Sequence, residues 1–77
     1  MEKDQIIIGI IKKLSGKPAP SVDEELFESG YLDSFALPDL VTELEQQFGL
    51  KIPDTDLNPR KFESVARIGS YLASRGA

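Results

Sequence analysis

One serine lies where an acidic connection gives way to a helical pattern, in the segment Gly30-Tyr31-Leu32-Asp33-Ser34-Phe35. A hydroxyl at the first residue of a helix would be exposed and held in place by the helix that follows. A serine in that position is a natural point for tethering another group. A plain helix cap is the alternative role for Ser34, because serine is among the best N-cap residues.

A second group of oxygen-bearing side chains, Asp54, Asp56 and Asn58, is spaced like the first ligands of an EF-hand calcium loop. That loop also needs a glycine and a glutamate where this chain has Pro59 and Val65. We therefore predict no metal site and expect Asp54 or Asp56 to cap a helical turn. Calcium sensing through these side chains is the alternative.

The chain contains neither histidine nor cysteine. Disulfides, thiolate nucleophiles and soft zinc ligands are therefore excluded. General acid–base catalysis would need a carboxylate or a lysine whose pKa is strongly shifted by burial, which a small core hardly provides. We predict that the protein is not an enzyme.

Charge is unevenly distributed along the sequence. Residues 23–56 hold ten acids and one lysine, a net charge of −9, whereas the remainder holds eight bases and three acids, a net charge of +5. Nucleic acid is an improbable partner because its binding needs a basic surface. We expect partners with basic docking faces and association that weakens in salt, the alternative being an acidic face that only keeps the protein in solution.

The length of 77 residues suits a single domain spanning residues 1–77. No apolar run approaches the roughly 20 residues of a membrane helix, and the first residues do not resemble a signal peptide. We expect a cytoplasmic monomer.

Apolar spacing predicts an all-α fold, a small four-helix bundle with three long helices and one short one. The long helices are expected at residues 4–15, 34–48 and 64–74, with Asp4 and Ser64 as caps and with regular geometry in the second starting near Pro38. A long connection, residues 17–33, and a short helical turn within residues 54–60 complete the chain. The expected core is Ile7, Ile10, Ile11, Leu14, Leu26, Phe27, Leu40, Val41, Leu44, Phe48, Ile52, Val65, Ile68 and Leu72.

Several segments together resemble the acyl and peptidyl carrier proteins. Leu26-Phe27 followed by Gly30-Tyr31-Leu32-Asp33-Ser34 is similar to the family's attachment signature, "LF..G.LDS". Residues 40–50 with Ile52-Pro53 are similar to its second helix and the "FGI.IP" step after it. The resemblance runs nearly end to end, and the ordered set is more specific than Asp-Ser alone.

The resemblance implies that Ser34 carries a 4′-phosphopantetheine arm, derived from coenzyme A and joined through a phosphodiester. A separate phosphopantetheinyl transferase would supply magnesium and a base, while Asp33 would cap the helix or hold that magnesium. For Phe35, packing into the core is the alternative to facing partners. The positions that match the family's partner-facing residues are Phe35, Asp39, Thr42, Glu45 and Gln46.

Two departures from the fatty-acid carriers favour a specialised pathway. Gln46-Gln47 stands where those carriers have consecutive glutamates, and residues 58–62 look more like carriers of polyketide, nonribosomal peptide or aminoacyl transfer. We expect a stand-alone carrier that shuttles acyl or aminoacyl thioesters between a loading ligase and a downstream synthase or transferase. The alternatives are a housekeeping fatty-acid carrier and an unmodified acidic helical adaptor.

Overall fold

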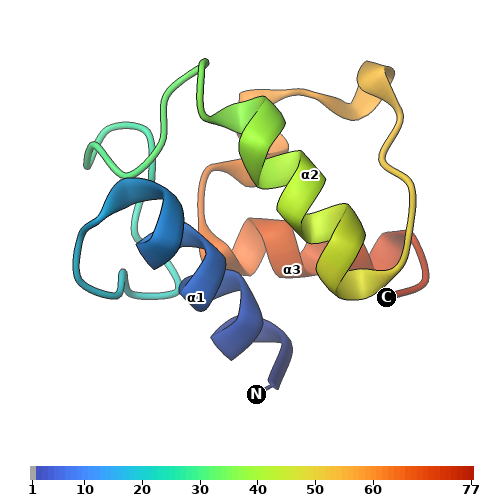
Figure 1. Cartoon of the computed structure of the whole chain (residues 1–77), viewed down its shortest axis with the longest axis horizontal. Coiled ribbons are helices and arrows are strands. Elements are labelled where there is room, and N and C mark those ends of the chain that lie inside the picture. Colours follow the sequence, from blue (N-terminus) through green and yellow to red (C-terminus); the bar gives the residue numbers. More distant parts are fainter. Residues whose placement is uncertain (1) are drawn as a thin grey trace.

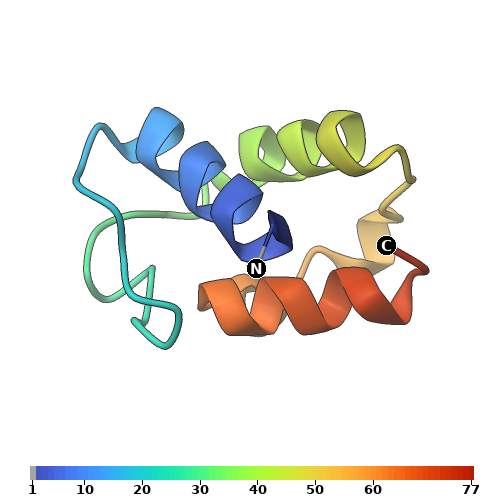
Figure 2. The same cartoon turned by 90° about the horizontal axis from the view of Figure 1, so that it is seen from below.

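Three α-helices make up the framework of the computed structural model, which describes residues 2–77. Figures 1 and 2 show α1 and α2 side by side, with α3 crossing beneath them. The predicted all-α fold with three long helices is confirmed, and no strand occurs in the described part of the chain. Two 3₁₀ turns, η1 and η2, replace the single short helix that was expected. The elements are α1 (Glu2–Ser15), α2 (Leu37–Phe48), η1 (Asp54–Asp56), η2 (Pro59–Phe62) and α3 (Val65–Ser74).

The helix ends follow local backbone chemistry. α2 starts next to Pro38 as expected, and it ends at Gly49, whose φ of 65° satisfies the left-handed C-terminal position. Ser64 caps α3, with its Oγ accepting a hydrogen bond from the Arg67 amide at 3.1 Å. The predicted cap at Asp4 is wrong, because α1 already begins at Glu2 and Asp4 lies within its first turn.

The core lies where the three helices meet. The expected residues are buried, except that Leu14, Phe27 and Phe48 are only partly buried. Phe62 of η2 was not predicted, yet it is fully buried and is the largest side chain at the centre of the core. Among residues 2–77, no helix combines the length and apolar character needed to cross a membrane.

The long connection between α1 and α2 is tied to the far side of the bundle. The Leu26 amide donates to the Glu63 carbonyl at 2.7 Å, and the Ala66 amide donates to the Val22 carbonyl at 2.9 Å. Leu26 and Leu32 are buried in the core, while Val22 remains exposed. Figure 1 shows this connection, cyan to green, along one side of the molecule, with its green end entering α2. The core therefore fixes the chain that precedes α2.

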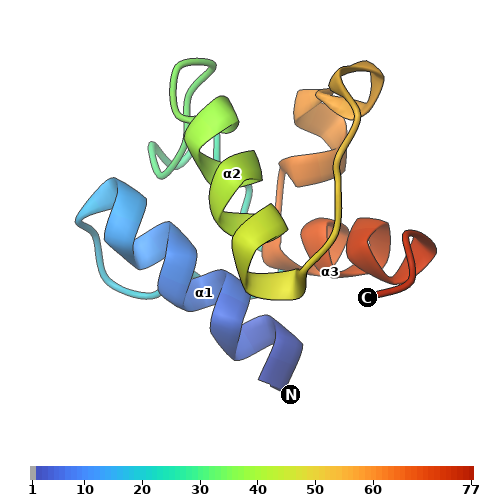
Figure 3. The same ribbon diagram turned by 45° about the vertical axis from the view of Figure 1, so that its right-hand side comes forward.

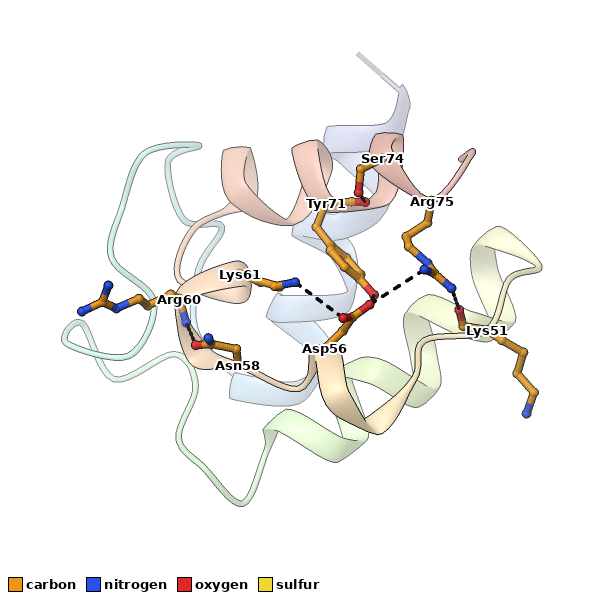
Figure 4. A network of polar contacts seen from close by, with 8 residues as sticks. All are labelled: Lys51, Asp56, Asn58, Arg60, Lys61, Tyr71, Ser74 and Arg75. Atoms are coloured by element: carbon orange, nitrogen blue, oxygen red, sulfur yellow. Dashed lines mark hydrogen bonds and ion pairs between the residues drawn. The ribbon is translucent and has the colours of Figure 1, made fainter.

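A polar network joins η1 to α3 (Figure 4). Figure 3 shows η1 and η2 in the chain that links α2 to α3. The Tyr71 hydroxyl donates to Asp56 Oδ2 at 2.6 Å, while the Lys61 ammonium lies 3.5 Å from Oδ1 and the Arg75 guanidinium 4.0 Å from Oδ2. The Tyr71 hydrogen bond is the main cause that lowers the pKa of Asp56. Burial, followed by the bond to Asp56, raises the pKa of Tyr71 to about 12.

Two of the oxygen-bearing side chains in and after η1, Asp56 and Asn58, have hydrogen-bond partners within the fold. Asp56 is engaged with Tyr71 and two cations, and within residues 2–77 no cluster of three or more acidic, histidine or cysteine side chains could hold a metal ion. The cap predicted at Asp54 or Asp56 is wrong. Asn58 caps η2 instead, accepting a hydrogen bond from the Arg60 amide at 3.0 Å.

Candidate functional site

Ser34 is exposed in a turn, residues 34–36, that leads directly into α2. Two buried leucines bracket this turn: Leu32 is 4% exposed and Leu37 is 6% exposed. Because both anchors are in the core, the backbone between them spans a short, fixed distance. No hydrogen bond within residues 2–77 involves the Ser34 hydroxyl. The side chain is thus held in place by its neighbours and left available to another molecule.

Asp33, rather than Ser34, caps the turn at residues 34–36 that leads into α2, whose own first residue has no side-chain cap. Asp33 Oδ1 accepts hydrogen bonds from the amides of Phe35 at 2.9 Å and Ala36 at 2.8 Å. The Asp33 carbonyl also accepts from the Ala36 and Leu37 amides, at 3.1 and 3.2 Å. The alternative that Ser34 is the cap is therefore wrong. Because Asp33 accepts these hydrogen bonds, the turn does not need the Ser34 hydroxyl as a cap.

The site fits a phosphodiester on Ser34, although the nearby backbone amides are not available to bind it. The Phe35 and Ala36 amides already point at Asp33, so they are not free for a phosphate. The positive end of the α2 dipole still favours a negative group at this position. What matters most for attachment is the exposed alcohol on an anchored turn, which a second protein can approach.

Phe35 is the most exposed large apolar side chain of the described residues, at 88%. The alternative that it packs into the core is wrong. An isolated aromatic ring in solvent contributes nothing to folding, but it can supply much of the binding energy of an interface. It lies directly beside Ser34. Asp39, Thr42 and Gln46, on the α2 surface beyond it, are also exposed.

Glu45 differs from the other predicted partner-facing residues. It is partly buried, and its Oε2 accepts a hydrogen bond from the Ile52 amide at 2.8 Å. Glu43, the acid that precedes it in α2, forms an ion pair with Lys13 of α1. Of the three acids of α2, only Asp39 is therefore exposed and without a partner among residues 2–77. The surface beside Ser34 has less available negative charge than the sequence suggested.

Comparisons with known proteins agree with this geometry. Residues 5–72 match the family model described as "Phosphopantetheine attachment site". D-alanyl carrier protein 2 of Lactiplantibacillus plantarum is 30% identical over 69 residues, which are 88% of this chain and 86% of that protein. The D-alanyl carrier proteins of Streptococcus pyogenes serotypes M5 and M1 are 36% identical over 47 residues, 61% of this chain and 60% of theirs. The match to the streptococcal proteins thus spans less than two thirds of their length.

Fold and site together define a small helical carrier domain. The chain belongs to the phosphopantetheine attachment family, whose members bear a covalently attached 4′-phosphopantetheine arm.

Proposed function

We propose that Ser34 is the attachment residue and that the protein carries aminoacyl groups as thioesters on its arm. The observation that carries this proposal is the Ser34 hydroxyl. It is exposed, has no hydrogen bond to any of residues 2–77, and lies in a segment that is similar to the family's attachment signature, within the matched residues 5–72. The arm supplies the thiol on which cargo is held. The protein itself positions the arm and presents it, while partner enzymes supply the catalysis.

Attachment is a group transfer from coenzyme A to the Ser34 hydroxyl. Ser34 Oγ attacks the phosphorus next to the pantetheine, a new O–P bond forms, and the bond to adenosine 3′,5′-bisphosphate breaks. The hydroxyl proton passes to a base of the phosphopantetheinyl transferase. Asp33 Oδ1 is occupied by two amides, so only Oδ2 would be available to the magnesium ion that accompanies coenzyme A.

An aminoacyl cargo is favoured over a fatty-acyl or polyketide cargo. The relatives reported above are named D-alanyl carrier proteins, and one of them matches over most of both chains. The reduced negative charge of the α2 surface points the same way, because it weakens electrostatic steering toward strongly basic partners. We therefore propose D-alanine, or a similarly small amino acid, as the cargo.

The docking surface that we propose consists of Phe35, Asp39, Thr42 and Gln46. Phe35 would enter an apolar pocket of the partner, and Asp39 would meet a basic side chain at its edge. The proteins that bind this docking surface would be the phosphopantetheinyl transferase, a ligase that loads the amino acid and a downstream transferase. Glu45 would act indirectly, by holding the segment after α2 against the helix.

The test is conversion of the purified chain by a phosphopantetheinyl transferase with coenzyme A, followed by intact mass. Wild type should gain the mass of one arm and Ser34→Ala should gain none. Ser21→Ala removes another exposed serine of the same connection and should convert like wild type. Conversion of Ser34→Ala, or failure of wild type with several transferases, would overturn the proposal.

A further inference from the structure

Lys17 reaches across the long connection to the turn that precedes Ser34. Its Nζ donates a hydrogen bond to the Ser29 carbonyl at 3.1 Å and lies 5.3 Å from the centre of the Tyr31 ring. It therefore makes two contacts with this turn, one polar and one with an aromatic face. We call this set of contacts, Lys17 with Ser29 and Tyr31, the Lys17 clasp.

Gly30 provides the space for the Lys17 clasp. A Cβ at this position would lie 3.1 Å from Lys17 Nζ, and the glycine has a φ of +83°, which other residues rarely adopt. The absence of a side chain at residue 30 leaves room for the ammonium close to the backbone of the turn. The close approach and the left-handed backbone occur at the same residue.

The Lys17 clasp joins the two ends of the connection. Lys17 follows α1 almost immediately, and Ser29 lies 12 residues further along the chain. Tyr31 leads into Leu32 and then into the turn that carries Ser34. Without the clasp, the turn at residues 29–31 would be held by its own backbone bonds and by the buried Leu26 and Leu32. Lys17 thus adds a fixed point from a separate part of the chain, close to the attachment residue.

We infer that Lys17 is a positioning residue for the modification of Ser34. This inference rests on the proposed attachment at Ser34. The Lys17 clasp restricts residues 29–34 to the conformation in which Asp33 caps the turn before α2 and Ser34 faces solvent. A transferase that binds only this conformation has an apparent affinity that scales with the fraction of molecules in that conformation. Loss of the clasp should therefore raise KM of the carrier substrate and leave kcat nearly unchanged.

The experiment uses the full chain with Lys17→Met, which keeps an unbranched apolar side chain of nearly the same length and removes the ammonium. Lys61→Met is the matched control, because the Lys61 ammonium also lies near an aromatic ring, 5.4 Å from the centre of Tyr71, and pairs with Asp56 in a separate part of the fold. Each variant is assayed for KM and kcat with a phosphopantetheinyl transferase, and for amide hydrogen exchange of residues 29–34. Lys17→Arg, which retains the charge and the donors, tests rescue.

We expect Lys17→Met to raise KM by up to about fivefold, the limit set by the size of an exposed cation–aromatic contact with one hydrogen bond. Its exchange at residues 29–34 should be faster, while Lys61→Met and Lys17→Arg should behave like wild type. Unchanged KM and exchange in Lys17→Met, or an equal change in Lys61→Met, would refute the role of Lys17 but not the proposed attachment at Ser34. A wild type that is never modified would refute the proposed attachment and this role with it, whatever the exchange shows.

Discussion

Replacing Asp33 by alanine should destabilise the unmodified protein by about 1.5 kcal/mol. Loss of an N-cap side chain costs about 1 kcal/mol, and loss of a negative charge at the start of a helix adds about 0.5 kcal/mol. Both apply, because one carboxylate oxygen accepts from two amides ahead of α2. For a domain of this size the melting temperature should fall by about 10 °C.

Two matched variants separate the contribution of the cap hydrogen bonds from that of the negative charge. Asp33→Asn keeps an acceptor oxygen and removes the charge, so its loss should be only about 0.5 kcal/mol. Ser34→Ala should be within about 0.5 kcal/mol of wild type, because the Ser34 hydroxyl makes no hydrogen bond within the described chain.

The assay is urea unfolding followed by circular dichroism, with the free energies extrapolated to water. Wild type and the three variants are compared before any arm is attached. An Asp33→Ala protein as stable as wild type would refute the assignment of the cap. So would a Ser34→Ala protein that is less stable than Asp33→Ala.

Three further predictions concern the rest of the surface and the polar network. Phe35→Ala should leave the unfolding free energy unchanged, because the ring is 88% exposed, and should weaken calorimetric binding to the loading ligase about tenfold; equal affinities would contradict the docking surface. Glu45→Ala should cost about 1 kcal/mol in urea unfolding by leaving the Ile52 amide without its acceptor, and Glu45→Gln should cost less; equal losses would argue against this hydrogen bond. Burial and the bond to Asp56 raise the pKa of Tyr71 from 10.0 to about 12, so its proton is bound more tightly in the folded state. The stabilisation from this tighter proton binding should be complete below about pH 10 and lost as the pH rises to about 12. Tyr71→Phe should not show this loss. Identical profiles of unfolding free energy against alkaline pH for Tyr71→Phe and wild type would contradict the prediction.

The helices could be predicted because their apolar residues repeat with a helical period. Leu37, Leu40, Val41 and Leu44 follow that period along α2 and are all buried. Phe62 could not be predicted in the same way, since it is a lone apolar residue among polar ones and its burial depends on η2 packing against α3. Its aromatic size was the only signal.

The candidate site was predicted in part. The position of Ser34 close to the start of a helix follows from the local sequence, although α2 itself begins three residues later, at Leu37. The exposure of Phe35 does not, because a single aromatic residue fits a core and a surface equally well. The hydrogen bond from the Ile52 amide to Glu45 and the contacts of Lys17 with the turn before Ser34 join residues distant in sequence. No local pattern marks such pairs, and they require the fold.

The central claim is that one particular hydroxyl receives the arm, and fragmentation of the modified peptide tests it most directly. Coexpression with a transferase, proteolysis and tandem mass spectrometry would locate the added group among Ser21, Ser29 and Ser34, which share one connection. The account predicts the arm on Ser34 in every modified molecule. An arm on Ser29, on Ser21 or on any other hydroxyl would contradict it.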